Sequence, residues 1–361
     1  MILAALVPLT LVGLHDVGGW DGLKDAVTNA KGGGDPLLHS WKGTGVGNVT
    51  NPLEASWIPI VFGLGFVLSF GYWTTNFAEV QRALSAKSLN AAQRTPLIGA
   101  YPKIFIPAIT IIPGLVALVT IKGLGGDNPD LEYNNAIPLL INEYLPNGML
   151  GVALAGLLAA FMAGVAANVS AFNTVVTYDL WEPYVKPGES DDYYIRFGRI
   201  ATTGGILIGI GTALIASGYN NIMDYIQLLF SFFNAPLFAT FIVGMFWRRM
   251  TPWAGFWGLV AGTLGAAAAH FAHAWEIINL GSDQAAAFWG AIVALVADAL
   301  VTVIVTLVTT PKPVDELQGL VYGMANVAEE APASERAWYR RPLPLGLGAL
   351  GLTVVLNLLF I

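Results

Sequence analysis

The 361-residue sequence contains no cysteine and few charged residues. Without cysteine, disulfide bonds and thiolate metal sites are excluded. Charged residues make up only 11% of the chain and hydrophobic residues 55%, whereas soluble domains carry about 25% charged residues. Glycine-rich phosphate loops, metal-ligand clusters and basic nucleic-acid patches are also missing from the sequence. The composition therefore indicates a multi-pass protein of the cell inner (plasma) membrane, and it argues against an enzyme, a bound cofactor and a nucleic-acid partner.

Nine apolar segments occur along the chain, and a span needs about 20 apolar residues to cross the lipid bilayer as a helix. The first segment, residues 1–14, is too short for this. A signal peptide is one interpretation, but no positive charge precedes the apolar run and no convincing cleavage site follows it. We therefore interpret residues 1–14 as the tail of an incomplete transmembrane helix. The eight longer segments are residues 56–76, 97–121, 147–176, 197–217, 222–246, 252–274, 285–310 and 342–361.

The distribution of Lys and Arg predicts the topology. Twelve of the 17 basic residues fall in alternate loops, and loops rich in Lys and Arg face the cytoplasm. The loops at 77–96 and 247–251 are thus predicted to be cytoplasmic, and the loop at 123–145 to be external. The resulting division is an external loop (15–55), five spans (56–246), two further spans (247–310), a cytoplasmic loop (311–341) and a last span (342–361).

One motif in this chain is specific to a family. The string YWTTNFAEVQRALSAKS begins at Tyr72 and is followed by the lysine of YPKIFIPAITIIPG, Lys103. Both stretches resemble the solute:sodium symporter family, and its bacterial sugar-transporting members in particular. The resemblance implies an all-α polytopic membrane protein of the LeuT-type transporter fold, in which two five-helix inverted repeats enclose solute and ion. Five consecutive spans are the odd number that inverts a duplicated repeat, so residues 56–246 would be the second repeat, followed by three C-terminal helices.

The family's solute positions carry over to three residues. Tyr72 would stack on the solute, although an aromatic belt at the membrane interface also explains a Tyr-Trp pair. Lys103 would hydrogen-bond the solute, or it would extend its ammonium to the cytoplasmic interface. Gln227, in the run Tyr225-Ile226-Gln227, would face the solute or hydrogen-bond a neighbouring helix. Ser69 and Asn76 complete the predicted solute-binding set.

The ion positions match the family poorly. Where family members carry two serines that give hydroxyl oxygens to sodium, this chain has Ala166 and Ala167, and a methyl group cannot ligate a hard cation. Ser170 and Asn173, further along the same helix face, would form a displaced site or simply pack between helices. Asp298 is predicted to be paired or protonated, because a carboxylate at the bilayer centre is costly.

The sequence thus predicts a secondary active transporter, a sodium:solute symporter homologue covering the C-terminal two-thirds of a family member, that moves a small polar solute by alternating access. Its partners would be the solute, the lipid bilayer, and a separate chain or a missing N-terminal segment that supplies the first repeat. The alternative is a non-transporting membrane subunit or sensor module that uses the same fold. Na+ is the coupling ion that the resemblance implies, and the two alanines favour weak dependence on it.

Overall fold

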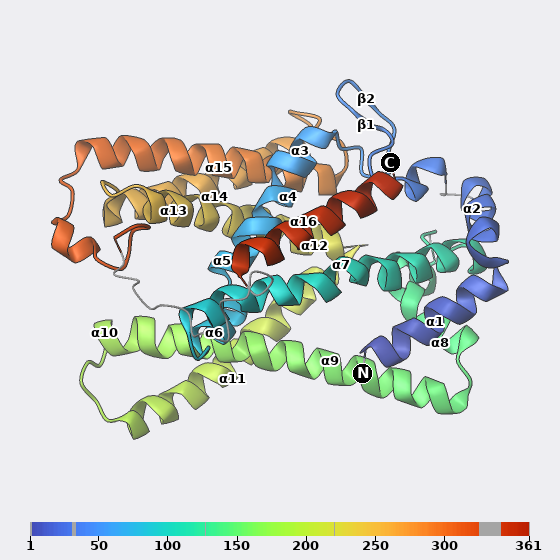
Figure 1. The fold of residues 1–361 in the computed structure, drawn as a ribbon, viewed down its shortest axis with the longest axis horizontal. Coiled ribbons are helices and arrows are strands. Elements are labelled where there is room, and N and C mark those ends of the chain that lie inside the picture. Colours follow the sequence, from blue (N-terminus) through green and yellow to red (C-terminus); the bar gives the residue numbers. More distant parts are fainter. Residues whose placement is uncertain (1, 31–33, 127, 220, 325–340, 361) are drawn as a thin grey trace. The chain divides into compact units, whose positions relative to one another are not determined.

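The computed structural model describes all residues except 1, 31–33, 127, 220, 325–340 and 361, and it is almost wholly helical (Figure 1). Among the described residues the only strands are β1 (Thr44–Gly45) and β2 (Asn48–Val49), which pair as an antiparallel hairpin. The chain divides into two compact units. The first unit holds residues 1–35 and 102–222, and the second holds residues 36–101 and 223–361. The predicted five-span segment 56–246 therefore contributes to both units.

Eight helical segments among the described residues are long and apolar enough to cross a bilayer. They coincide with the eight predicted spans, and the additional helix α1 (Ile2–Asp16) is shorter, as expected. This confirms an all-α polytopic membrane protein. The eight segments are Trp57–Thr75, Leu89–Thr120, Asn147–Tyr184, Asp191–Ala216, Ile222–Phe246, Pro252–Ala274, Asp283–Val308 and Pro342–Leu359.

Several predicted loops contain helices. Residues 77–96 form α6 (Phe77–Leu84) and the start of α7 (Leu89–Thr120). The external segment 15–55 contains α2 (Gly19–Asn29) and the turn η1 (Asp35–Leu38). The segment 123–145 contains η3 (Pro129–Leu131), η4 (Tyr133–Asn135) and α8 (Ala136–Tyr144). In the segment 311–341, η7 (Val314–Leu317) is helical, and residues 325–340 lie outside the described part of the chain.

The physical reason for the helices in 77–96 is local capping. The Asn76 side chain accepts a hydrogen bond from the Ala78 amide (3.0 Å) at the start of α6, and Ser88 Oγ accepts one from the Ala91 amide (3.1 Å) at the start of α7. Such side chains satisfy the free N–H groups of a first helical turn. The polarity that excludes this segment from hydrocarbon therefore does not prevent it from being helical.

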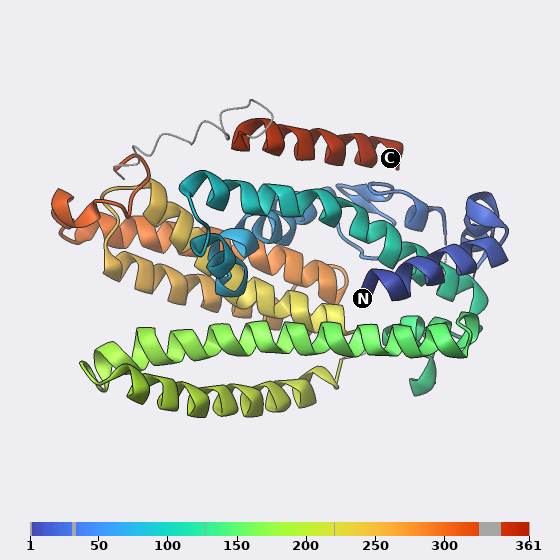
Figure 2. The same cartoon turned by 60° about the horizontal axis from the view of Figure 1, so that its bottom comes forward.

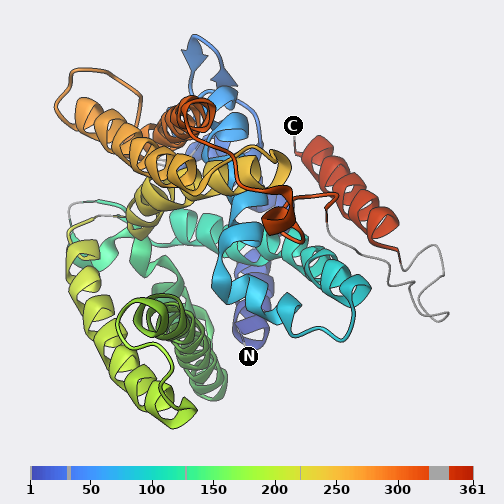
Figure 3. The same ribbon diagram turned by 90° about the vertical axis from the view of Figure 1, so that its left-hand side faces the viewer.

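The first unit is built on an antiparallel helix pair. Helix α9 (Asn147–Thr174) continues through the π-helical turn η5 (Val175–Trp181) and α10 (Glu182–Tyr184), and α11 (Asp191–Ala216) returns beside it (Figures 2 and 3). Glycines on α11 allow this approach, because a Cβ atom at Gly205 would lie 2.7 Å from the Phe172 ring. Small residues at helix interfaces permit such close backbone packing in membrane proteins.

The second unit contains the first and the last four spans. The first span consists of α3 (Trp57–Phe62), α4 (Leu64–Phe66), the π-helical turn η2 (Val67–Gly71) and α5 (Tyr72–Thr75). A second π-helical turn, η6 (Phe230–Asn234), connects α12 (Ile222–Leu229) to α13 (Ala235–Phe246). Helices α14 (Pro252–Ala274), α15 (Asp283–Val308) and α16 (Pro342–Leu359) complete the unit. Its buried core is formed by Leu64, Val67, Ala235, Phe238, Ala266, Ala291 and Ala294.

Helices α14 and α15 pack along their whole length through residues spaced four apart. On α14 the buried positions are Ala254, Gly258, Gly262 and Ala266. On α15 the facing stripe is Gly290, Ala294, Asp298, Thr302 and Thr306, all buried. Residues four apart lie on one helix face, so a strip of small side chains on α14 covers a strip on α15 whose second half is polar.

Candidate functional site

The first span of the second unit is irregular where the sequence is rich in glycine. The backbone at Gly63 departs from helical geometry (φ −97°, ψ −123°), and a Cβ atom there would overlap the carbonyl oxygens of Phe288 and Pro59. Four residues further on, η2 widens the helix into a π turn. Single π turns within α-helices occur frequently at functional sites. The glycines thus allow close contact with α15 and place an irregular turn directly before Tyr72.

Tyr72 packs against the other irregular span of the second unit. Its ring lies edge-on to the ring of Phe230 at a centroid distance of 5.9 Å, and edge-on to Trp73 at 6.5 Å. Phe230 opens η6 and lies three residues after Gln227, one helical turn along the same face. The Tyr72–Phe230 contact therefore places Tyr72 in the part of the second unit that also holds Gln227.

The span that carries Gln227 is irregular just before Pro236, where η6 (Phe230–Asn234) forms a π-helical turn. Pro236 lacks an N–H group and so leaves a carbonyl of the preceding turn without its helical partner, and the wider turn η6 ends two residues before it, at Asn234. The span then continues as α13.

Two buried amide oxygens lie on this span without a partner. Within the described part of the chain, neither Gln227 Oε1 nor Asn234 Oδ1 has a hydrogen-bond partner. The Gln227 side chain is only 7% exposed. Ser231, between them on the same face, donates a hydrogen bond to the Leu228 carbonyl (2.8 Å). Since buried polar groups are nearly always paired, these two oxygens are candidate acceptors for a ligand.

Asn234 was not among the predicted site residues. The signal that would have found it is the spacing of Gln227, Ser231 and Asn234, which places three polar side chains on one face of an otherwise apolar span. The run Asn234-Ala235-Pro236 by itself indicates only a change in backbone conformation, because proline lacks an N–H group. The structure adds that the amide oxygen of Asn234 is buried and unpaired.

The other three predicted solute residues, Ser69, Asn76 and Lys103, differ in their exposure and in the unit to which they belong. Ser69 lies in η2 and is exposed on the chain surface. The side-chain oxygen of Asn76, Oδ1, accepts a hydrogen bond from the Ala78 amide and so caps α6, which is a structural role. Lys103 is exposed near the middle of α7 and belongs to the first unit, whereas Ser69, Tyr72, Asn76 and Gln227 all belong to the second.

The predicted ion positions lie on α9 in the first unit. Ala166 and Ser170 are exposed, and Ala167 is half-buried. Asn173 Oδ1 accepts a hydrogen bond from Thr177 Oγ1 (2.9 Å), and it lies where a Cβ atom at Gly198 of α11 would approach it to 2.7 Å. Asn173 therefore serves helix packing in this structure. The two alanines supply no oxygen ligand, so these residues do not fit a sodium site of the family's usual kind.

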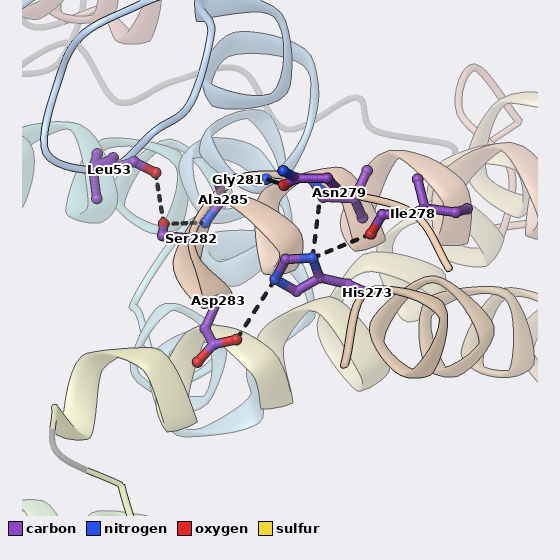
Figure 4. A network of polar contacts seen from close by, with 9 residues as sticks. Leu53, His273, Ile278, Asn279, Gly281, Ser282, Asp283 and Ala285 are labelled. Atoms are coloured by element: carbon purple, nitrogen blue, oxygen red, sulfur yellow. Dashed lines mark hydrogen bonds and ion pairs between the residues drawn. The ribbon is translucent and has the colours of Figure 1, made fainter. Parts of the chain in front are cut away.

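A histidine network closes the turn between α14 and α15 (Figure 4). His273 Nε2 lies 3.7 Å from Asp283 Oδ1, and its Nδ1 contacts the Ile278 carbonyl oxygen and the Leu280 amide, both at 3.4 Å. Ser282 donates a hydrogen bond to the Leu53 carbonyl (2.6 Å) and caps α15 through the Ala285 amide. This network holds the helix hairpin against the segment that precedes the first span, which is a structural role.

Eight long apolar helical segments among the described residues, several of them with buried polar side chains, define a multi-pass membrane protein. The profile of the sodium:solute symporter family matches residues 1–262. The chain belongs to the sodium:solute symporter family.

Its relatives are cotransporters by name. The sodium/mannose cotransporter SLC5A10 of Bos taurus is 27% identical over 282 residues, which is 73% of this chain and 47% of the relative. The sodium/myo-inositol cotransporter 2 of Oryctolagus cuniculus is 31% identical over 58% of this chain and 33% of its own length. The sodium/glucose cotransporter of Vibrio parahaemolyticus is 28% identical over 56% of this chain and 39% of its own length. The chain thus spans about half or less of the length of these relatives. Their names describe transporters and not enzymes, in agreement with the sequence-based expectation.

Proposed function

We propose that this chain forms part of a secondary transporter that carries a small polyhydroxylated solute, such as a hexose or an inositol, by alternating access. Membership of the sodium:solute symporter family supports the class of activity. The names of the relatives, which specify mannose, myo-inositol and glucose, support the class of solute. In this proposal residues 56–246 are the second of two five-helix inverted repeats of the LeuT-type fold, and the solute lies between the repeats near the bilayer midplane.

The observation that carries the proposal is the buried, unpartnered Gln227 Oε1 beside the Tyr72–Phe230 ring pair. A sugar or polyol presents many hydroxyl donors around an apolar ring face, so it would pair with a free amide oxygen and stack on an aromatic ring at once. Leaving such an oxygen unpaired costs about 1–3 kcal/mol, which a bound hydroxyl would recover. Asn234 Oδ1 offers a second acceptor about two turns further along the same face, and Lys103, Ser69 and Asn76 are the further proposed contacts.

The residues at the family's ion positions indicate how strongly transport depends on sodium. Na+ is the ion in the names of the relatives. Ala166 and Ala167 remove two hydroxyl ligands, and sodium is a hard cation that needs oxygens. We therefore propose weak sodium dependence, with facilitated transport or coupling to another ion such as the proton as the consequence.

Uptake of labelled D-glucose, D-mannose and myo-inositol into proteoliposomes tests the function, using the full-length protein that contains this chain. We expect uptake of at least one of the three, and its loss in Gln227→Ala. The matched control is Gln318→Ala, because Gln318 is exposed on the segment after α15 and its removal should leave uptake unchanged.

Absence of both uptake and binding for all three solutes in correctly folded protein would overturn the proposal. It would favour the non-transporting subunit or sensor that uses the same fold. Equal loss of uptake in the Gln227 and Gln318 variants would show that the assay reports folding and not solute recognition.

A further inference from the structure

A buried carboxyl group lies where three helices of the second unit meet. Asp298 on α15 is 0% exposed. Thr240 Oγ1 of α13 donates a hydrogen bond to its Oδ2 (2.6 Å), and Thr302 Oγ1, one turn along α15, lies 3.2 Å from its Oδ1. The Thr302 hydroxyl also lies 3.3 Å from the Ala254 carbonyl oxygen of α14. Among the described residues no cation forms an ion pair with Asp298.

The two contacts of the Thr302 hydroxyl cannot both be hydrogen bonds if Asp298 is ionised. A hydroxyl group has one proton to donate, whereas a carbonyl oxygen and a carboxylate oxygen can only accept. With an ionised Asp298, one of the two contacts would place lone pairs against each other inside a buried site, where an unpaired acceptor is costly. With a neutral Asp298, the Oδ1–H group donates to Thr302 Oγ1, and the Thr302 hydroxyl then donates to the Ala254 carbonyl. Every contact is then a hydrogen bond.

The packing around the Asp298 carboxyl group is too close for a metal ion, whereas a proton can bind there. A Cβ atom at Gly258 would overlap Thr302 Oγ1 and lie 3.1 Å from Asp298 Oδ1. A Cβ atom at Gly262 would lie 3.0 Å from Asp298 Cβ. A sodium ion needs several oxygen ligands around a space of its own, and here α14 closes directly over the carboxyl group. A proton needs no such space.

The charged and titratable groups on the packed elements lie well away from Asp298. At 1.5 Å per residue, each of these groups lies at least about 12 Å along its helix from the level of Asp298 on α15, Gly262 on α14 or Thr240 on α13. Arg249 Nη2 is bonded to the Leu307 carbonyl oxygen (3.3 Å). These groups are His270 and His273 on α14, Asp283 on α15, Asp224 on α12, and Arg248 and Arg249 after α13.

We propose that Asp298 is a proton-binding site where α13, α14 and α15 pack together, with Thr240 and Thr302 as its hydrogen-bonding partners. The proton resides on Oδ1 and completes the chain from Asp298 through Thr302 to the Ala254 carbonyl. Loss of the proton breaks one link of this chain and so loosens the contact of α15 with α14. Because Thr240 belongs to the same span as Gln227, the state of the proton acts on the helix that carries the proposed solute contact. The proton site itself does not depend on the proposed solute.

Infrared difference spectroscopy of the purified full-length protein tests the proposal directly. Exposed Asp and Glu side chains titrate near pH 4, so a titration from about pH 5 upward leaves them ionised throughout. We expect the C=O stretching band of a protonated carboxyl group at the start of this titration, its loss as the pH rises, and its absence in Asp298→Asn. Asp283→Asn, at an exposed carboxylate, should leave the band unchanged.

A second variant keeps the proposal testable if Asp298→Asn does not fold. Thr302→Val has nearly the same shape but removes the acceptor of the carboxyl proton, so the band should persist at a shifted frequency. Lack of a protonated-carboxyl band in the native protein, or a band that survives in Asp298→Asn, would overturn the assignment. An unshifted band in Thr302→Val would contradict the hydrogen-bond chain.

Discussion

The ring of Tyr72 lies edge-on against the ring of Phe230, with centroids 5.9 Å apart and an interplanar angle of 80°. Each of these residues adjoins a π-helical turn, Tyr72 directly after η2 and Phe230 at the start of η6. The contact joins two irregular spans, and its two residues are 158 positions apart in the sequence. It also places an aromatic ring one helical turn from the unpartnered oxygen of Gln227.

Removal of the Gln227 amide should weaken solute binding. In the full-length protein, Gln227→Ala is expected to cost on the order of 1–3 kcal/mol of binding free energy, or roughly 5- to 150-fold in Kd, because a solute hydroxyl loses its partner. Tyr72→Ala and Lys103→Ala should have effects of similar size. Equilibrium binding of labelled solute measures these changes. Native affinity in all three variants would show that the family's solute positions do not carry over to this chain.

The role of Tyr72 can be divided between its ring and its hydroxyl. If the ring stacks on the solute, Tyr72→Phe should retain most of the affinity, whereas Tyr72→Ala should lose the stacking contact and bind clearly more weakly. Binding isotherms of the two variants make the comparison. Equal losses in both would instead identify the hydroxyl as the contact, and Trp73→Phe serves as the control for general disturbance of this turn.

Sodium dependence tests the effect of Ala166 and Ala167. We expect uptake in sodium buffer to exceed uptake in choline buffer only slightly, because the two hydroxyl ligands that family members supply are missing. Ala167→Ser with Ala166→Ser should then increase sodium dependence. Strong native dependence that Ser170→Ala abolishes would establish a displaced site instead. Strong dependence that survives Ser170→Ala would contradict both explanations.

The topology can be tested because the chain has no native cysteine. Ser85→Cys, between α6 and α7, is expected to be shielded from an impermeant thiol reagent in intact cells and to react once the membrane is opened. Asp130→Cys, in the 123–145 segment, should react from outside. Both positions are exposed on the chain. Labelling of the Ser85→Cys variant from outside would reverse the predicted orientation.

Gly71 is a packing position whose enlargement should destabilise the second unit. A Cβ atom at Gly71 would lie 2.8 Å from Phe238 Cβ, so Gly71→Ala forces Phe238 to move and is expected to cost about 1–3 kcal/mol of stability. Thermal unfolding in detergent measures the change. Gly99→Ala is the matched control, since nothing lies within 4 Å of a Cβ atom there, and a helical Gly-to-Ala change stabilises by up to about 1 kcal/mol. Unaltered stability of Gly71→Ala would show that the contact with Phe238 is loose.

The sequence by itself determined the class of protein and the positions of its spans. A run of about 20 apolar residues is expected to cross the bilayer as a helix, because a single segment satisfies its own backbone polar groups only in that form. Five of the eight long segments therefore appear in the structure within two residues of their predicted bounds, and the other three extend six to eight residues further at one end. The motif around Tyr72 likewise gave the family, since it depends on the order of side chains and not on their arrangement in space.

The tertiary structure decided which polar side chains have hydrogen-bond partners and which do not. The periodicity of an apolar span shows that Asp298, Asn234 and Asn173 are unusual, but not whether each has a partner. Asn173 is bonded to Thr177, Asn234 is buried without a partner, and Asp298 lies among two threonines and a carbonyl from three helices. The hydrogen-bond chain of Asp298 joins positions 240, 302 and 254, and only the close approach of glycine-lined helices brings these positions together. That approach depends on side-chain packing between segments far apart in the chain, which no local pattern of residues specifies.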